Sequence, residues 1–411
     1  MSAQHWFAVT APGLEDVTGS ELAGLGITAR AETGGLAWDG PLDDAYRANL
    51  RLRTATRVLL HVDTFSARSF IELERKLRRS PWLRFVTTGH PVRLRVSCAK
   101  SRLYHEGAIA ERVLEAIAHV TAAPVAPAPA ARTSDTLEDG DDDDAQLFVI
   151  RFLRDTCTIR ADSSGALLHR RGYRPAIGKA PLRETLAAAM LLAARWDPRA
   201  PLLDPFCGSG TIPIEAALLA RRIAPGLARA DRTPRPFAFQ HWPDFDAARW
   251  QREVERARNE ITAHAVAPII ASDASASAIR HARANAARAG VNADISFAVR
   301  PFTATAGMDE PAVLPTTHPD GSGADAARRP PPHMVTNPPW GVRLGDRSAA
   351  QAVQAQLVLA ARSSDTGGSI AFLTPDDALA RTLAPHVREA FVTRTGGIAV
   401  RLLVRPASDG T

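Results

Sequence analysis

The chain has 411 residues, of which 45% are hydrophobic and 23% are charged. These proportions are typical of a globular protein with a sizeable buried core, and the length allows two or three domains. They exclude a collagen-like, a wholly disordered or a disulfide-dominated chain. The three cysteines lie far apart and form no CxxC pair, so we expect no metal site.

The beginning of the chain gives no sign of export or membrane insertion. Residues 1–17 contain no basic segment followed by an apolar stretch, as a signal peptide would. The longest apolar run, residues 186–194, is far shorter than the roughly 20 residues needed to span a bilayer. We therefore expect a cytoplasmic protein in a reducing compartment, with no membrane partner.

Charge is distributed unevenly along the chain, although the net charge is only +6. Residues 135–144 hold seven acids and no base, whereas residues 47–112 hold fifteen basic and five acidic residues. A second basic run covers residues 151–183. Clustered arginine is typical of a surface that binds phosphates, which indicates a nucleic-acid partner. The alternative is a general preference for arginine, since only three of the fifty basic residues are lysine.

Short strands alternate with helices in the first 165 residues, which predicts an α+β region. The apolar patterns indicate strands at 5–11, 36–40, 57–67, 91–101 and, as a hairpin, 146–165. They indicate helices at 13–26, 42–53, 70–82 and 105–120. Residues 121–145 are rich in proline and acids, so we expect a flexible insertion there.

The second half follows a different pattern, in which buried strands alternate with apolar helices. Strands are predicted at 202–206, 268–274, 293–299, 333–337 and 369–375, and a final pair in 391–405. Helices are predicted at 181–196, 211–222 and 275–290. This alternation predicts a doubly wound, mostly parallel sheet with an antiparallel edge. Residues 303–333 form a second expected insertion.

The sequence DPFCGSGT at residues 204–211 follows a predicted strand, where ligands of open parallel sheets bind. Gly208 and Gly210 allow a tight turn and a close approach of backbone to ligand, and Asp204 can accept hydrogen bonds. The spacing is not that of a phosphate-binding P-loop, nor of the dinucleotide fingerprint. A tight turn without a ligand is the alternative.

Two further strand ends carry candidate site residues. Asp273 ends the predicted strand 268–274, where an acid can bind both hydroxyls of a ribose; a helix N-cap is the alternative. Asn337 begins the sequence NPPW, whose prolines fix a rigid turn. The oxygens of Asn337 and Pro338 could accept both hydrogens of an exocyclic amine, and Trp340 could stack on a base. A proline turn beside a core tryptophan is the alternative.

Together these motifs resemble those of known families. DPFCGSGT resembles motif I of class I S-adenosylmethionine-dependent methyltransferases, and NPPW resembles their amino-methylating [DNS]PP[YFW] motif. Residues 92–113 and 168–191 are similar to proteins with a ferredoxin-like domain and a THUMP RNA-binding domain. The whole chain is similar to THUMP-containing RNA guanine-N2 methyltransferases, especially the branch that modifies large-subunit ribosomal RNA.

The resemblance implies an α/β fold with three domains. These are a ferredoxin-like domain at 1–60, a THUMP domain at 61–172 and a Rossmann-like class I methyltransferase domain at 173–411. It implies S-adenosyl-L-methionine as the cofactor, RNA as the partner, and ribosomal RNA as the expected substrate. The implied catalytic residues are Asn337, Pro338 and Trp340. The implied cofactor-binding residues are Asp204, Phe206, Gly208, Gly210, Thr211 and Asp273. The implied RNA-binding residues are Arg93, Arg95, Lys100, Arg102, Arg170, Arg171 and Arg174.

The sequence departs from the family pattern at two places. NPPW replaces the more usual NPPY, which keeps the aromatic ring and removes a hydroxyl. Residues 300–304 read RPFTA where the family often has an acid that contacts the cofactor's adenine, and Phe302 could provide an apolar wall instead. Three alternatives stay open: a transfer-RNA guanine-N2 methyltransferase, an adenine-N6 methyltransferase of nucleic acid, and a non-catalytic RNA-binding protein. The oligomeric state is open too.

Overall fold

The computed structural model describes residues 3–121, 145–174, 182–302, 332–340, 353, 355–358 and 368–407. The chain divides into two compact units. Unit 1 consists of Met1–Thr10, Thr18–Leu168 and Arg235–Arg256. Unit 2 consists of Ala11–Val17, His169–Pro234 and Ala257–Thr411. The predicted insertions at 121–145 and 303–333 lie almost wholly outside the described residues.

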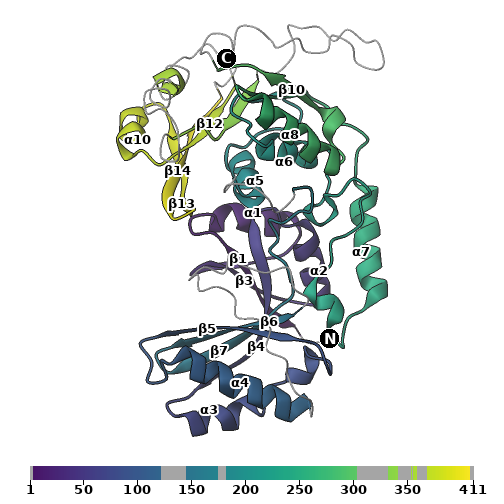
Figure 1. Cartoon of the computed structure of the whole chain (residues 1–411), viewed down its shortest axis with the longest axis vertical. Helices are drawn as coiled ribbons and strands as arrows, with labels where there is room; N and C mark the ends of the chain where they lie inside the picture. The colour runs from purple at the N-terminus through teal and green to yellow at the C-terminus, as the bar shows by residue number, and fades with distance from the viewer. Residues whose placement is uncertain are drawn as a thin grey trace. The chain divides into compact units, whose positions relative to one another are not determined.

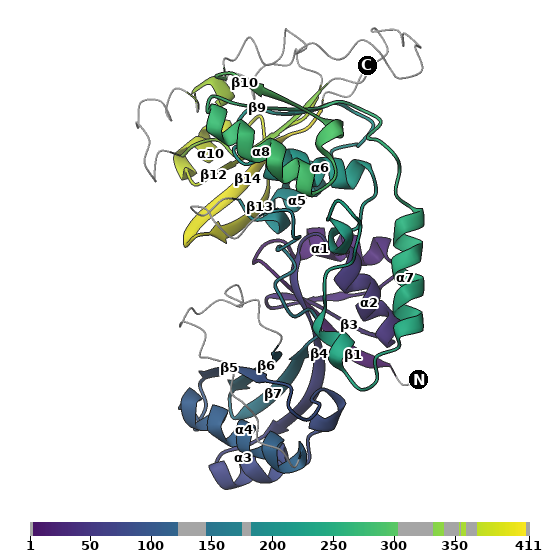
Figure 2. The same ribbon diagram turned by 45° about the vertical axis from the view of Figure 1, so that its right-hand side comes forward.

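Unit 1 is built on a seven-stranded sheet of order β2-β3-β1-β4-β7-β6-β5. Its strands are β1 (Gln4–Thr10), β2 (Arg30–Glu32), β3 (Gly35–Gly40), β4 (Ala55–Ser66), β5 (Val92–Ala99), β6 (Gln146–Leu153) and β7 (Thr156–Asp162). The helices of this part of the chain are α1 (Glu15–Gly24), α2 (Leu42–Arg51), α3 (Phe70–Leu77) and α4 (Glu106–Thr121). Figure 2 shows α3 and α4 on one face of the sheet formed by β4 to β7. The predicted hairpin in 146–165 is confirmed: β6 and β7 pair antiparallel.

Strand β4 joins the two halves of this sheet. Its first part pairs with β1, for example Leu60 with Trp6, and its later part pairs with β7 as far as Ser66 with Thr156. The predicted boundary between residues 60 and 61 therefore falls inside a continuous strand (Figure 1). The domain limits 1–60, 61–172 and 173–411 stay a prediction.

A segment from the second half of the sequence completes the core of unit 1. The fully buried Trp242 stacks on Trp6 with 6.5 Å between ring centroids, and its indole nitrogen donates to Gln146 Oε1 at 2.7 Å. Phe239 packs on Tyr46 at 4.7 Å, and the Tyr46 hydroxyl accepts a hydrogen bond from the Asp246 amide. Residues 235–256 thus supply apolar surface that the first 168 residues lack.

Unit 2 contains the second sheet, of order β10-β9-β8-β11-β12-β14-β13. Pairing is parallel from β10 to β12, and β14 pairs antiparallel with both β12 and β13. The strands are β8 (Leu202–Asp204), β9 (Ile269–Asp273), β10 (Ile295–Val299), β11 (His333–Thr336), β12 (Ile370–Thr374), β13 (Arg388–Thr395) and β14 (Ile398–Arg405). The predicted architecture, a mostly parallel sheet with an antiparallel edge, is confirmed.

The helices of the second half are α5 (Glu184–Ala193), α6 (Thr211–Ala220), α7 (Ala247–Asn259), α8 (Ala276–Arg288) and α10 (Asp377–Leu383). Four 3₁₀ turns complete the described elements: Trp82–Arg84, Pro225–Leu227, Ala238–His241 and Asn292–Asp294. Helix α5 begins later than predicted, at Glu184, because Arg183 is its extended N-cap residue. The expected opening residue Pro181 lies outside the described residues. Within the described ranges, no helix combines the length and apolarity required to span a bilayer.

We expect Trp242→Ala to destabilise unit 1 by about 3–5 kcal/mol, because it removes a large buried ring and one hydrogen bond. Hydrogen exchange in the peptide that carries β6 should become faster in this variant. Trp196→Ala is the control, since Trp196 is a buried tryptophan of unit 2. If both variants change exchange in β6 equally, residues 235–256 do not complete the core of unit 1.

Candidate functional site

Three parallel strands of unit 2 end side by side. Asp204 of β8 lies in register with Ala271 of β9, and Leu203 of β8 is in register with Met334 of β11. Because parallel strands point the same way, their carboxyl ends share one edge of the sheet. DPFCGSGT, Asp273 and NPPW follow these three ends. The fold therefore brings together three motifs that are far apart in the sequence.

The glycines of DPFCGSGT have different tasks. Both adopt the left-handed conformation, with φ of 53° at Gly208 and 86° at Gly210. A Cβ on Gly210 would lie 3.0 Å from that of Ala282 in α8, so this glycine lets α6 pack closely on α8. A Cβ on Gly208 would meet nothing within 4 Å. The backbone at Gly208 is therefore open to a ligand.

Asp273 holds the glycine loop in place. Its Oδ2 accepts a hydrogen bond from the amide of Gly208 at 3.0 Å, and its Oδ1 accepts one from the amide of Ser275 at 2.8 Å. Ser275, whose hydroxyl accepts from the Ala278 amide, is the N-cap of α8, so the N-cap alternative for Asp273 is wrong. A carboxylate has about four acceptor positions, so this one can still accept hydrogen bonds from two ligand hydroxyls.

Asp204 lies beneath the loop, with only 1% of its surface exposed. The hydroxyl of Thr336 donates to its Oδ1 at 2.6 Å, and the Phe206 amide donates to the same oxygen at 3.2 Å. Its Oδ2 is buried and has no hydrogen-bond partner in the described part of the chain. Burial, with a smaller contribution from the nearby Asp273 carboxylate, raises the pKa of Asp204 to about 7, although the hydrogen bonds from Thr336 and Phe206 oppose this rise. Since Thr336 directly precedes Asn337, this bond ties the NPPW strand to the glycine loop.

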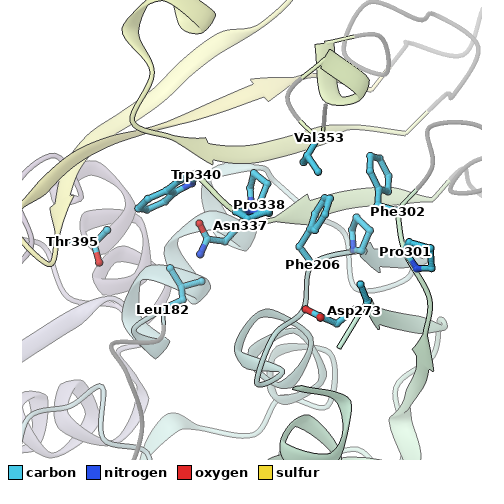
Figure 3. Close-up of a pocket in the computed structure, with 13 residues that line it drawn as sticks. Leu182, Phe206, Asp273, Pro301, Phe302, Asn337, Pro338, Trp340, Val353 and Thr395 are labelled. Atoms are coloured by element: carbon cyan, nitrogen blue, oxygen red, sulfur yellow. The ribbon is translucent and has the colours of Figure 1, made fainter. Parts of the chain in front are cut away.

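A cavity of about 650 Å³ lies at this edge (Figure 3). One side of it is formed by Asn337, Pro338 and Trp340. The other side is formed by Phe206 and Phe302, whose ring centroids lie 5.1 Å apart, and Asp273 also lines the cavity. The expected apolar wall at Phe302 is thus present. The size is ordinary for a small-molecule site.

Asn337 and Trp340 of NPPW both line this cavity. The Oδ1 atom of Asn337 is buried and has no hydrogen-bond partner among the described residues. The indole nitrogen of Trp340 donates to the carbonyl of Leu373 in β12 at 3.3 Å, which fixes the ring. A buried acceptor without a partner costs free energy unless a ligand satisfies it. The arrangement is therefore suited to a ligand that carries N–H groups.

Another predicted cofactor residue, Thr211, is not among the residues that line the cavity. Thr211 is buried at the start of α6, and its hydroxyl accepts from Arg174 at 3.3 Å. Arg174 also donates to Glu184 Oε2 at 2.9 Å and to the Leu182 carbonyl at 3.0 Å. Burial raises the pKa of Glu184 to about 7, an effect that the Arg174 charge opposes. Arg174 thus links the end of DPFCGSGT, at Thr211, to Glu184 at the start of α5.

One predicted RNA contact is wrong. Arg171 is 1% exposed, and its Nε lies 3.5 Å from Glu215 Oε1, which is equally buried. A side chain held in the interior by an acid cannot contact RNA phosphates. The sequence carried a signal for this pairing: Glu215 is the one acid in the apolar helix TIPIEAALLA, and a buried acid needs a cationic partner.

The remaining predicted RNA residues lie in two places. Arg93 and Arg95 are partly buried on β5, and Lys100 and Arg102 are exposed in the loop that follows; all four belong to unit 1. Arg170 is exposed in unit 2, whereas the side chain of Arg174, also in unit 2, is only 17% exposed and pairs with Glu184. In the described ranges, no group of three or more His, Cys, Asp or Glu side chains is placed to hold a metal ion.

Thr336 is the residue of this site that sequence analysis missed. A threonine in a strand is an ordinary β-branched residue, and nothing in the sequence reveals that its hydroxyl meets Asp204.

Comparison with protein families places two domains on the chain. Residues 171–313 match the RMKL-like methyltransferase domain, and residues 5–59 match the RlmL ferredoxin-like domain. Both matches agree with the fold: the first includes β8 to β10 and the second includes β1 to β3.

Similar proteins cover nearly the full chain. The protein slr0064 of Synechocystis, provisionally named an RNA methyltransferase, is 30% identical over 98% of this chain and 96% of its own length. The ribosomal RNA large subunit methyltransferase K/L of Syntrophotalea carbinolica is 32% identical over 98% of this chain. The match covers 54% of that relative, so the chain spans about half its length. The solved structure of SMU.472, complexed with SAH, is 26% identical, covers 100% of both chains and has a TM-score of 0.79.

We expect Thr336→Val to weaken binding of S-adenosylhomocysteine by about fivefold to tenfold, the scale of one lost hydrogen bond to a carboxyl group. Valine keeps the shape of threonine, so packing of β11 changes little. Thr336→Ser, which keeps the hydroxyl, should bind as the parent does in calorimetry. Equal affinity in Thr336→Val and the parent would show that the bond to Asp204 does not hold the cofactor loop.

The raised pKa of Asp204 predicts a pH-dependent stability. Between about pH 4 and its folded pKa of about 7, Asp204 is neutral in the folded chain and ionised in the unfolded chain. Its contribution to stability is therefore present at low pH and is lost as the pH rises through about 7. From about pH 5 to about pH 8, the free energy of unfolding of the parent should fall relative to Asp204→Asn by on the order of 2 kcal/mol. If the free energy of unfolding changes with pH in the same way in both proteins, the raised pKa of Asp204 is contradicted.

Proposed function

The chain belongs to the family of RNA methyltransferases that carry an RMKL-like methyltransferase domain, and we propose that it methylates the exocyclic N2 of guanine in large-subunit ribosomal RNA. The observation that carries this proposal is the buried, unpartnered Oδ1 of Asn337 in a cavity that Asp273 also lines. The names of the K/L relatives support ribosomal RNA as the substrate. An RNA substrate agrees with the cytoplasmic location expected from the sequence.

The residues at the cavity fit S-adenosylmethionine, the cofactor that the fold implies. Asp273 has free acceptor positions for the two ribose hydroxyls, and Phe206 and Phe302 offer apolar surface to an adenine ring. The open backbone at Gly208 leaves room for the methionine part. When bound, this cofactor supplies a methyl group on a positively charged sulfur, which is strongly electrophilic.

The residues of NPPW would position the amine that attacks this methyl group. The Asn337 Oδ1 and the Pro338 carbonyl would each accept one N–H hydrogen, which directs the nitrogen lone pair toward the cofactor side of the cavity. The same two oxygens favour the positive charge that develops on nitrogen during the attack. The amine loses its proton easily after transfer, so the site needs no strong base. Positioning therefore provides most of the rate enhancement.

Trp340 would hold the base that carries the amine. Its ring is fixed by the bond to the Leu373 carbonyl and lies on the same side of the cavity as Asn337. A paired base must leave its helix to enter such a site, at a cost of a few kcal/mol, and stacking on an aromatic ring offsets part of this cost. Exposed basic side chains, including Lys100, Arg102 and Arg170, would bind RNA phosphates without reading sequence.

We expect Asn337→Ala to slow methyl transfer by roughly 10²-fold or more, because it removes one preorganised acceptor. Its affinity for S-adenosylhomocysteine should stay within about threefold of the parent, since Asp273 and the glycine loop are unchanged. Transfer of a labelled methyl group to RNA and calorimetry of cofactor binding measure the two effects.

Trp340→Phe is the matched variant for the aromatic ring. It keeps a stacking surface and should retain much of the activity, whereas Trp340→Ala should lose activity and require more RNA for half-maximal rate. Parental activity in Asn337→Ala would mean that the amine does not bind at NPPW, and the proposed reaction would fail.

A further inference from the structure

Three loops of unit 1 leave its sheet at the same end. In the strand register, Ser66 of β4 pairs with Thr156 of β7, Thr156 pairs with Leu153 of β6, and Leu153 pairs with Ala99 of β5. These four residues form one row across the sheet. The segment after β4, the turn between β6 and β7 and the loop after β5 therefore lie next to one another, across about 14 Å at the usual strand spacing of about 4.8 Å.

Backbone hydrogen bonds fix these loops to one another. The Arg154 amide donates to the carbonyl of Ala99 at 3.2 Å, and the Asp155 amide donates to the hydroxyl of Ser101 at 3.0 Å. Asp155 accepts from the amide of Arg102 at 2.7 Å through its side chain and from the amide of Ala67 at 2.9 Å through its carbonyl. The side chains on these loops therefore stand on a rigid base.

Four cationic side chains project from these loops: Arg68, Lys100, Arg102 and Arg154. All four residues are exposed. The neighbouring acids offset only part of this charge: Asp155, 19% exposed, pairs with Arg68 at 3.3 Å, and Glu72 accepts the Arg68 amide. Glu106, at the start of α4, is the nearest further acid in the sequence. The loops thus carry a positive surface suited to several phosphates.

Tyr104 gives this surface a second property. Tyr104 is 78% exposed and lies in the same loop as Lys100 and Arg102. The preceding Leu103 is only 6% exposed, so its buried side chain anchors the loop. An exposed aromatic ring among cations can stack on a nucleobase while the cations hold the adjoining phosphates. In a duplex the base faces are covered by neighbouring bases, so stacking of this kind selects single-stranded RNA. We name Arg68, Lys100, Arg102, Tyr104 and Arg154 the turn cluster.

We propose that the turn cluster binds a single-stranded stretch of the RNA substrate, with a base stacked on Tyr104 and phosphates on the four cations. This site lies in unit 1, so it is separate from the methyl-transfer cavity of unit 2. The enzyme would then bind RNA with an unpaired segment in preference to fully paired RNA. The inference rests on the RNA substrate of the proposed function, and it concerns binding and not chemistry.

The test uses the full chain and two labelled RNA probes in fluorescence anisotropy: a mixed-sequence single strand of about 12 nucleotides and a blunt-ended duplex of the same length. Tyr104→Ala should lower affinity for the single strand by about tenfold, the scale of one lost stacking contact, and change duplex affinity less than about twofold. Tyr104→Phe should bind both probes as the parent does. Equal losses on both probes would overturn the single-strand assignment, and no loss on either would overturn the site.

The cations can be tested without damage to the fold. Lys100 and Arg154 adopt the left-handed conformation, each with φ of 50°, which glycine accepts without strain. Lys100→Gly and Arg154→Gly should therefore fold normally, bind the single strand more weakly, and each lower the salt slope of log affinity by about 0.7. Arg222→Gly is the matched control, because Arg222 is an exposed arginine of unit 2 with φ of 54°.

If Arg222→Gly lowers affinity for the single strand as much as Lys100→Gly and Arg154→Gly do, only the total charge of the chain matters, and the proposal is overturned. The outcome is independent of the proposed reaction, because anisotropy measures binding of the probes and not methyl transfer. If Tyr104→Ala loses binding while Asn337→Ala keeps full methyl transfer, the turn cluster stands and the assignment of NPPW fails. If Tyr104→Ala binds as the parent does while Asn337→Ala loses methyl transfer, the turn cluster is overturned and the proposed reaction stands.

Discussion

The hydrogen bond between Thr336 and Asp204 is the constraint on which the site depends. It joins adjacent strands β8 and β11 at the point where each ends, one residue before Asn337 and two residues before Phe206. Both partners are buried, at 0% and 1% exposure, so the bond acts in a medium of low dielectric constant. The glycine loop and NPPW therefore keep a fixed separation, which the proposed reaction, driven by positioning, requires.

Largely buried ion pairs at α5 and α6 serve the same purpose. Arg174 connects the first residue of α6 with Glu184 of α5, and Arg171 neutralises Glu215 within α6. Removing one member of such a pair leaves a charge without a partner in the interior, which is costly, so the helices keep their mutual position. The basic run 151–183 is consequently not one RNA-binding surface, because part of it stabilises the fold and part of it is exposed.

The fold and the outline of the site could be predicted from the sequence, because local pattern determines both. Apolar alternation identified the strands, and three strand ends with unusual residues identified the edge where the ligand binds. Partners that are remote in the sequence could not be predicted. Thr336 is a common strand residue. The sequence indicates that Glu215 needs a cationic partner, but not that this partner is Arg171, 44 positions earlier. Residues 235–256 join unit 1 only through packing of Trp242 and its neighbours. That Asp273 is not the N-cap of α8 became clear only from the geometry of Ser275.

The central claim is that the cavity at NPPW methylates a guanine amine of ribosomal RNA, and nucleoside analysis tests it most directly. Large-subunit ribosomal RNA from cells that lack this protein would be incubated with the purified chain and S-adenosylmethionine carrying an isotopically labelled methyl group. After digestion to nucleosides, mass spectrometry should find the label in N2-methylguanosine at one or a few positions. Label in N6-methyladenosine, or label only when transfer RNA replaces ribosomal RNA, would contradict the account.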